Sequence, residues 1–79
     1  EPLLQIPAAL ELAKSAKSFG LDVWCYTGYT LEEIPPAASE LLKNIDVLVD
    51  GEYVEELRDL ELAFRGSKNQ RIIHLNEVR

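Results

Sequence analysis

The sequence has little of several features that would point to particular classes of protein. One cysteine among 79 residues allows no internal disulfide and no metal site built from cysteines alone. No apolar run approaches the roughly 20 residues needed to span a membrane, and no segment resembles a signal peptide. A net charge of −6 argues against nucleic-acid binding, which requires basic charge gathered on one face. These absences predict a cytoplasmic protein that binds neither a membrane nor nucleic acid.

The length and the first residues indicate a single piece of a longer protein. Seventy-nine residues form at most one domain, and 47% hydrophobic content is ordinary for a soluble globular chain. There is no initiator methionine, and Glu1-Pro2 leads directly into a helical pattern. We therefore expect residues 1–79 to be one fragment.

The hydrophobic patterning predicts alternating helices and strands. Pro7 and the apolar residues at helical spacing predict a helix that Gly20 ends. Leu21–Tyr26, rich in Val, Trp, Cys and Tyr, predicts a strand. Thr30 to Glu33 predicts a capped turn, and Pro35-Pro36 must end or restart the helix there. The remaining expected elements are a helix over 37–43, a strand over 45–50, a helical turn near 54–58, a strand over 71–75 and a frayed tail over 76–79.

Apolar strands that alternate with helices predict the α/β class, with a parallel three-stranded sheet and flanking helices. Ligands bind beyond the C-terminal ends of such strands, so the loops after Tyr26 and Asp50 should share one edge. Residues 64–71 precede their strand, so this topology places them at the opposite edge unless they bend back. A parallel sheet needs cover on both faces, so we also expect self-association beside Leu21–Tyr26.

A polar segment, residues 64–71, is the strongest candidate site. It holds three of the eight cations of an acidic chain, Arg65, Lys68 and Arg71. These cations could clamp a carboxylate, a phosphate or a peptide backbone, because a planar guanidinium suits such groups. The alternative is a solvated loop. We favour a site because Asn69 and Gln70 are costly to order without partners.

Two strand-end loops are further candidates. The Tyr26–Tyr29 loop offers hydroxyls and backbone N–H groups to a ligand, or simply ends a strand. The Asp50–Glu52 loop offers a carboxylate for a ribose hydroxyl or a cation, or is a solvated strand end.

Several isolated residues have structural interpretations. His74 has no second histidine near it, so we interpret it as a core or edge histidine rather than a metal ligand. Cys25, Trp24 and Phe19 are predicted to lie in the core. No nucleophile–base pair, phosphate-binding loop or zinc spacing is present. From the residues alone, the chain is an α/β fragment with a polar ligand site.

Three runs resemble the anaerobic ribonucleoside-triphosphate reductase activating family of radical S-adenosylmethionine enzymes: Gly20–Thr30, Ile45–Glu52 and Phe64–Ile72. The resemblance implies the C-terminal part of a partial (β/α) barrel whose full-length protein uses a 4Fe-4S cluster and S-adenosylmethionine. Cleavage of the cosubstrate would yield a 5′-deoxyadenosyl radical, which takes hydrogen from a glycine of anaerobic ribonucleotide reductase. A donor such as flavodoxin would supply the electron.

The same resemblance implies roles for particular residues. Glu1-Pro2 matches the end of a Gly-Gly-Glu-Pro motif that holds the methionyl amino group. Asn69, together with Gly66, matches a Gly-x-x-Asn spacing at the active-site opening. The implied cofactor-binding residues are Glu1, Pro2, Thr27, Asp50 and Asn69, and the implied partner-binding residues are Arg65, Lys68 and Arg71.

The chain departs from the family in its cysteines. The family's cluster is held by a Cys-x3-Cys-x2-Cys motif upstream of Glu1, whereas Cys25 lies in a predicted strand. We therefore expect no cluster on this chain's own cysteine and no activity from the chain alone. The alternatives are an activase of the pyruvate formate-lyase type and a non-catalytic module that binds a nucleotide or peptide.

Overall fold

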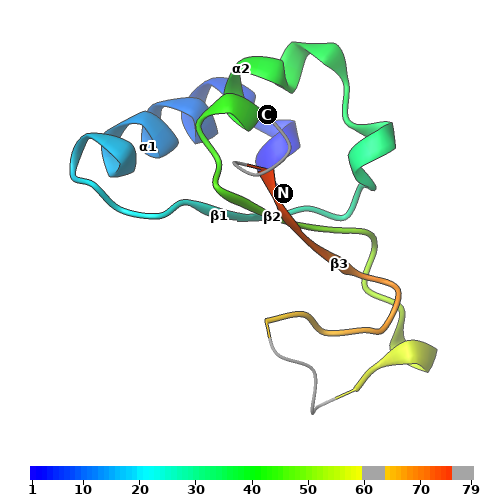
Figure 1. Ribbon diagram of the computed structural model, residues 1–79. Coiled ribbons are helices and arrows are strands. Elements are labelled where there is room, and N and C mark those ends of the chain that lie inside the picture. Colours follow the sequence, from blue (N-terminus) through cyan, green and yellow to red (C-terminus); the bar gives the residue numbers. More distant parts are fainter. Residues whose placement is uncertain (60–63, 76–79) are drawn as a thin grey trace.

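Two helices lie on one side of a three-stranded sheet in the computed structural model, which describes residues 1–59 and 64–75 (Figure 1). The tail predicted to fray, 76–79, lies outside the described residues. The elements are η1 (Pro2–Leu4), α1 (Ile6–Ser18), β1 (Trp24–Tyr26), η2 (Leu31–Glu33), η3 (Pro36–Ala38), α2 (Ser39–Lys43), β2 (Val47–Asp50), η4 (Glu55–Leu57) and β3 (Arg71–His74), where η denotes a short 3-10 helix.

The predicted signals at both ends of the first helix are confirmed. Pro7 lies in the first turn of α1, where its missing N–H has no intrahelical partner to lose. Gly20 follows the helix with φ of +74°, a left-handed conformation that glycine adopts without a steric penalty. The sequence did not predict η1, the short turn in which the Leu3 N–H donates to the Glu1 carboxylate at 2.9 Å.

The two prolines divide the connection between β1 and β2. Thr30 and Glu33 make the expected reciprocal contact, since the Glu33 carboxylate accepts from the Thr30 N–H and hydroxyl, each at 2.9 Å. The turn they cap is the single 3-10 turn η2, and a new turn begins at Pro36 and leads into α2. The Pro35-Pro36 break was therefore predicted correctly.

The predicted parallel sheet is wrong in its third strand. The strand order is β1-β2-β3, with β1 parallel to β2 and β3 antiparallel to β2. A third parallel strand needs a crossover that carries the chain back along the sheet. Within the described residues, the 51–70 connection contains only the one-turn η4 and extends as a lobe beyond the sheet edge (Figure 1). The chain therefore re-enters the sheet from the edge at which it left.

The core lies between the helices and one face of the sheet. Cys25, Leu48 and Ile73 are aligned across the three strands on that face. The cluster's buried members are Ala13, Cys25, Leu41, Ile45, Leu48 and Leu75. The burial predicted for Cys25 is thus confirmed.

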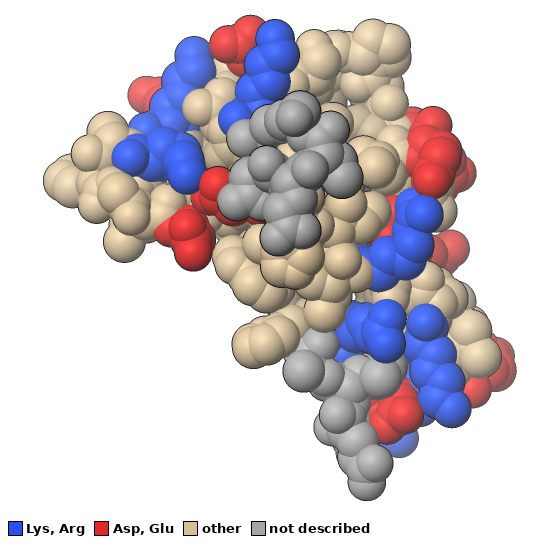
Figure 2. All heavy atoms as spheres, viewed as in Figure 1, with Lys and Arg blue, Asp and Glu red and all other residues tan. Residues whose placement is uncertain are grey.

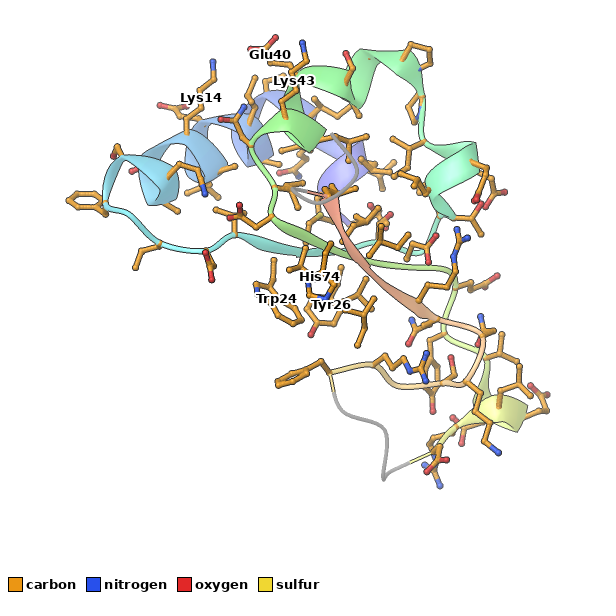
Figure 3. All side chains as sticks on the ribbon, in the orientation of Figure 1. Lys14, Trp24, Tyr26, Glu40, Lys43 and His74 are labelled. Atoms are coloured by element: carbon orange, nitrogen blue, oxygen red, sulfur yellow. The ribbon has the colours of Figure 1, made fainter. Side chains whose placement is uncertain are left out.

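The burial predicted for Trp24 and Phe19 is wrong. Successive strand residues point to opposite faces, so Trp24 lies on the face away from the helices. There its side chain, 39% exposed, meets the Phe64 ring at 5.2 Å, and Tyr26 and His74 lie on the same face (Figure 3). Phe19 follows the last residue of α1 and is 78% exposed.

An ion pair joins α1 to the sheet at the end far from the strand-end loops. Lys17 Nζ lies 3.0 and 2.9 Å from the two Asp46 carboxylate oxygens, and the Val23 N–H donates to the same group at 2.8 Å. Asp46 is buried, so these donors compensate for its lost hydration. Lys17 therefore connects α1 to the residue that precedes β2.

The surface separates charged and apolar areas. Basic side chains gather over the two helices and over the 51–70 lobe in the view of Figure 2. Leu4 and Leu12, at 74% and 73% exposure, flank an open groove along α1. No helix of the described ranges, 1–59 and 64–75, has the length and apolar content to cross a bilayer.

We predict that the chain self-associates through the exposed side of α1 and the free edge of β1, because apolar area and unpaired strand edges favour association. Leu12→Glu should lower the apparent mass measured by light scattering at high concentration. Leu57→Glu, which places the same charge on η4 in the lobe, is the matched control. A wild-type chain that scatters as a compact monomer would contradict this prediction.

Candidate functional site

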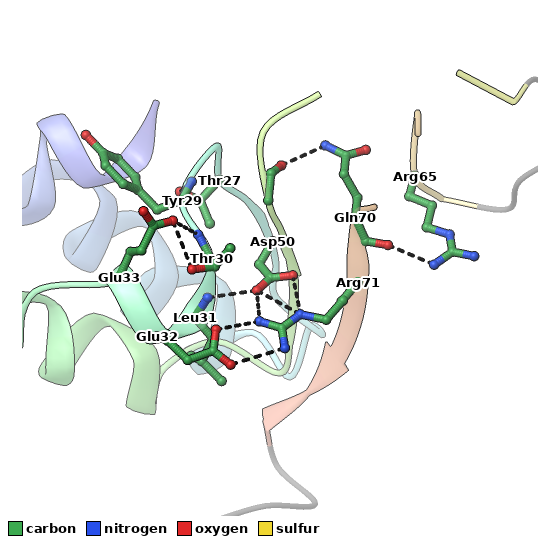
Figure 4. Close-up of polar contacts among 11 residues, drawn as sticks. Thr27, Tyr29, Thr30, Leu31, Glu32, Glu33, Asp50, Arg65, Gln70 and Arg71 are labelled. Carbon is green, nitrogen blue, oxygen red and sulfur yellow. Dashed lines mark hydrogen bonds and ion pairs between the residues drawn. The ribbon is translucent and has the colours of Figure 1, made fainter. Parts of the chain in front are cut away.

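Three polar segments meet at one edge of the sheet because β3 is antiparallel. Residues 27–33 follow β1, residues 50–52 comprise the last residue of β2 and the two after it, and residues 65–71 lead into β3 and include its first residue (Figure 4). The register places Arg71 directly opposite Asp50. The polar segment therefore lies at the same edge as the two strand-end loops. A parallel third strand would have placed it at the opposite edge of the sheet.

Asp50 is the buried centre of this edge. Its side chain is fully buried, which excludes the alternative of a solvated strand end. The carboxylate accepts from the Leu31 N–H at 2.7 Å and from Arg71 Nε at 3.0 and 3.2 Å, and it also contacts Arg71 Nη2. Burial opposes ionisation, but the hydrogen bonds from Arg71 and Leu31 hold the pKa of Asp50 below its ordinary value.

Arg71 bridges Asp50 to a second carboxylate. Its Nη1 and Nη2 donate to the Glu32 oxygens at 3.2 and 2.7 Å (Figure 4). Hydrogen bonds to Asp50 and then to Glu32 raise the pKa of Arg71, and the bond from Arg71 lowers the pKa of Glu32. Two carboxylates therefore hold the guanidinium, although the Arg71 side chain is 47% exposed, and the partner-binding role stays a prediction.

Glu1 joins the N-terminus to the loop after β1. Its carboxylate accepts from the Gly28 N–H at 2.8 Å and from the Thr27 hydroxyl at 3.1 Å to both oxygens. Burial would raise the pKa of Glu1, but the Gly28 and Leu3 N–H groups lower it overall. Glu1 and Thr27, both predicted as cofactor-binding, are thus in direct contact. Pro2 lies beside them in η1 and faces a different hollow, against α1.

The donors of the polar segment are used within the protein. Gln70 Oε1 accepts from the Gly66 and Ser67 N–H groups at 2.8 and 3.2 Å, and its Nε2 donates to the Gly51 carbonyl at 3.0 Å. Asn69 Nδ2 donates to the Glu52 carbonyl at 2.7 Å. The segment is therefore an internally bonded loop, which is neither the solvated loop nor the open clamp considered from the sequence.

The packing of this loop shows why residue 66 is a glycine, and the loop holds Arg65 and Lys68 in different environments. A Cβ at Gly66 would lie 2.9 Å from the Tyr53 ring, so a larger residue would displace that ring. Arg65 Nη1 donates to the Gln70 carbonyl at 2.8 Å, whereas Lys68 is exposed on the lobe. Of the three predicted partner-binding residues, Lys68 and Arg71 are exposed and Arg65 is half-buried.

An open cleft of about 740 Å³ lies between these segments. Glu1 and Asn69 line the cleft, whereas Thr27 and Asp50 do not. Thr27 donates a hydrogen bond to Glu1, which lines the cleft. Asp50 accepts one from Leu31, the neighbour of the lining residue Thr30. The full lining is Glu1, Gly28, Tyr29, Thr30, Glu33, Gly51, Glu52, Val54 and Asn69.

Sequence reasoning missed two acidic groups of the cleft and the outer partner of Arg71. Glu33 was interpreted only as a capping residue, although its place in the Thr30–Glu33 turn next to a candidate loop was a usable signal. Glu52 was noted in its loop but not selected as a site residue. Glu32 carried no signal, because its contact with Arg71 joins residues 39 apart.

The carboxylates at the cleft favour a ligand with positive charge. Among the described residues that line it, three are acidic, Glu1, Glu33 and Glu52, and none is Lys or Arg. Carboxylates accept hydrogen bonds from ammonium groups and attract cationic centres. No cluster of three or more His, Cys, Asp or Glu side chains within residues 1–59 and 64–75 is arranged to hold a metal ion. His74 is exposed on edge strand β3, as an edge histidine would be.

Comparisons with known proteins agree with one another. The family described as 4Fe-4S single cluster domain matches residues 1–73. An anaerobic ribonucleoside-triphosphate reductase-activating protein of Escherichia coli is 42% identical over 72 residues, which are 89% of this chain and 47% of that relative. The protein of the same name from Vibrio cholerae is 44% identical over 71 residues, 87% of this chain and 45% of the relative. This chain therefore spans about half the length of these relatives. No solved structure matches it.

We predict that Asp50→Asn lowers the free energy of unfolding at neutral pH by about 1–3 kcal/mol, the effect of weakening hydrogen bonds at a buried charged group. The lowered pKa means that ionised Asp50 stabilises the fold above its ordinary pKa of about 3.9. That contribution disappears as the pH falls through the lower folded-state pKa. Urea unfolding followed by Trp24 fluorescence from about pH 7 to pH 2 measures both effects.

Glu40→Gln, at an exposed carboxylate on α2, is the control for this experiment. The Asp50→Asn curve should converge on the wild-type curve at the acid end. Two curves that stay parallel throughout would contradict the role given to the ionised carboxylate.

Proposed function

This chain belongs to the family of 4Fe-4S single cluster domains, as a homologue of anaerobic ribonucleoside-triphosphate reductase-activating proteins, and we propose that it forms the cosubstrate-binding part of such an activase. The complete protein would be a radical S-adenosylmethionine enzyme that generates a glycyl radical on anaerobic ribonucleotide reductase. The observation that carries the proposal is the acidic cleft at the strand ends, with Glu1 at its margin.

The groups of the cleft suit S-adenosylmethionine. Its ammonium and sulfonium groups are positive, and Glu1, Glu33 and Glu52 supply negative charge. Glu1 stays ionised over a wide pH range because its pKa is lowered, and it is held in place by Thr27 and Gly28. We assign Glu1 to the methionyl ammonium group, with Asn69 at the opening of the cleft. When bound, the cosubstrate supplies the radical that abstracts hydrogen from the partner's glycine.

The residues of this chain do not fit a 4Fe-4S cluster. Such clusters are held by several cysteine thiolates, and this chain has only Cys25. Cys25 lies buried in β1, and burial raises the pKa of its thiol, away from the thiolate form. Cluster ligands would come from another part of a protein of the relatives' length, and we expect this chain alone to be inactive.

The partners follow from the proposed activity. The principal partner is the glycyl-radical subunit of anaerobic ribonucleotide reductase, with Arg65, Lys68 and Arg71 as candidate contacts. A cytoplasmic electron donor such as flavodoxin would reduce the cluster. The names of the relatives favour this reductase over a pyruvate formate-lyase-type partner. A non-catalytic nucleotide- or peptide-binding module is the remaining alternative.

The proposal predicts cosubstrate cleavage by a protein of the relatives' length that contains this sequence, after reconstitution with iron and sulfide. The measurements are 5′-deoxyadenosine formation and the radical signal on the reductase. Glu1→Ala should raise the KM for S-adenosylmethionine about 10-fold or more, which corresponds to one charge-assisted hydrogen bond.

Glu11→Ala, on the exposed side of α1, is the matched control and should leave the KM unchanged. Absence of 5′-deoxyadenosine with the wild-type protein would contradict the activase proposal. Radical formation on pyruvate formate-lyase alone would favour the other type of activase.

A further inference from the structure

Two walls of the cleft are joined by one direct backbone hydrogen bond, from the Gly51 N–H to the Tyr29 carbonyl, and by further contacts that lie behind the cleft. The first wall comprises Gly28, Tyr29, Thr30 and Glu33, and the second comprises Gly51 and Glu52. Three residues join the walls from behind without lining the cleft: Asp50, Arg71 and Glu32. We call these three residues the clamp.

The clamp fixes the first wall through both its backbone and a side chain. The Leu31 N–H, at the start of η2, donates to Asp50 at 2.7 Å. The next residue, Glu32, accepts from Arg71 through both of its oxygens. Nearby, the Gly51 N–H donates to the Tyr29 carbonyl at 2.8 Å. The loop that forms the first wall is thus attached to the end of β2 and the start of β3 at Tyr29, Leu31 and Glu32.

Arg71 is the member of the clamp that no other residue can replace. Asp50 is fully buried, and a buried carboxylate needs a charged or strongly donating partner. The planar guanidinium presents one set of N–H groups to Asp50 and another to Glu32, an arrangement that the single ammonium of lysine cannot reproduce. Arg71 can do this because the antiparallel register places it opposite Asp50.

The residues next to Arg71 hold the second wall. Gln70 donates to the Gly51 carbonyl, and Asn69 donates to the Glu52 carbonyl. The short stretch 69–71 therefore contacts both walls, through Arg71 on one side and through two side-chain amides on the other. Arg71 is not among the residues that line the cleft, so any effect of Arg71 on a ligand would pass through the two walls.

We propose that Arg71 is a positioning residue of the cleft, which sets the spacing of its two walls by bridging Asp50 and Glu32. The identity of the ligand, S-adenosylmethionine, rests on the proposed function. The bridging role rests on the contacts of the clamp alone. Arg71 would accordingly be a structural determinant of ligand binding, and its predicted contact with the partner protein stays a separate prediction.

The test combines ligand affinity with amide exchange in the 79-residue chain. Arg71→Ala should weaken S-adenosylmethionine binding, measured by NMR titration under conditions where the variant is folded, by about 10-fold, as when a group that orients a ligand-binding residue is lost. Hydrogen exchange of the Leu31 and Gly51 amides should become faster in the same variant. A purely stabilising residue would change neither quantity in the folded protein beyond its effect on global unfolding.

Three further variants complete the test. Arg58→Ala removes an exposed guanidinium of the same lobe, which pairs with Glu55 at 3.5 Å, and it should change affinity less than about 2-fold. Arg71→Lys should restore part of the affinity. Glu32→Gln weakens only the exposed half of the bridge and provides a milder variant should Arg71→Ala fail to fold.

The outcomes separate this inference from the proposed function. Faster exchange together with weaker binding supports both. Faster exchange in a chain whose wild-type form does not bind S-adenosylmethionine supports the clamp and counts against the cosubstrate assignment. Unchanged exchange at Leu31 and Gly51 in Arg71→Ala or Glu32→Gln, or unchanged affinity in a folded variant of a binding chain, overturns the positioning role.

Discussion

The ion pair between Asp50 and Arg71 is the interaction on which the functional edge of this molecule depends. A carboxylate at the end of the central strand has no water around it, so it must be paired. The antiparallel register supplies Arg71 as the pairing group, and the loop after β1 supplies the Leu31 N–H. One buried charge therefore draws together three segments that are far apart in the sequence.

This arrangement gives the polar residues two different roles, one in building the cleft and one in lining it. Residues with buried or bridging contacts build the cleft. Acidic residues place carboxylates at its surface, where Glu1 and Glu33 are also held by hydrogen bonds within the protein. The concentration of donors in residues 64–71 serves mainly the first purpose, because their amides and guanidinium groups bond to the protein. The acidic lining serves the second, and it is consistent with a cosubstrate that carries positive charge.

Local features were predictable from the sequence, and non-local ones were not. Gly20, Pro35-Pro36 and the Thr30–Glu33 turn act within a few residues, so their effects could be read directly. The direction of β3 depends on how the 51–70 connection folds, and apolar strands look alike in either direction. The error over Trp24 arose similarly, because a strand pattern does not say which face the helices cover.

The same limit applies to the site. Thr27, Asp50 and Asn69 could be singled out by type and by resemblance, but their partners could not, since the Arg71–Glu32 contact crosses the fold.

The direction of β3 is the most direct test of the account, and proton NMR of the folded chain measures it. An antiparallel register predicts a strong α-proton contact between Val49 and Ile72, together with a contact between the Leu31 amide and the Asp50 side chain. Contacts in the order of a parallel pair, with no approach of Leu31 to Asp50, would contradict it.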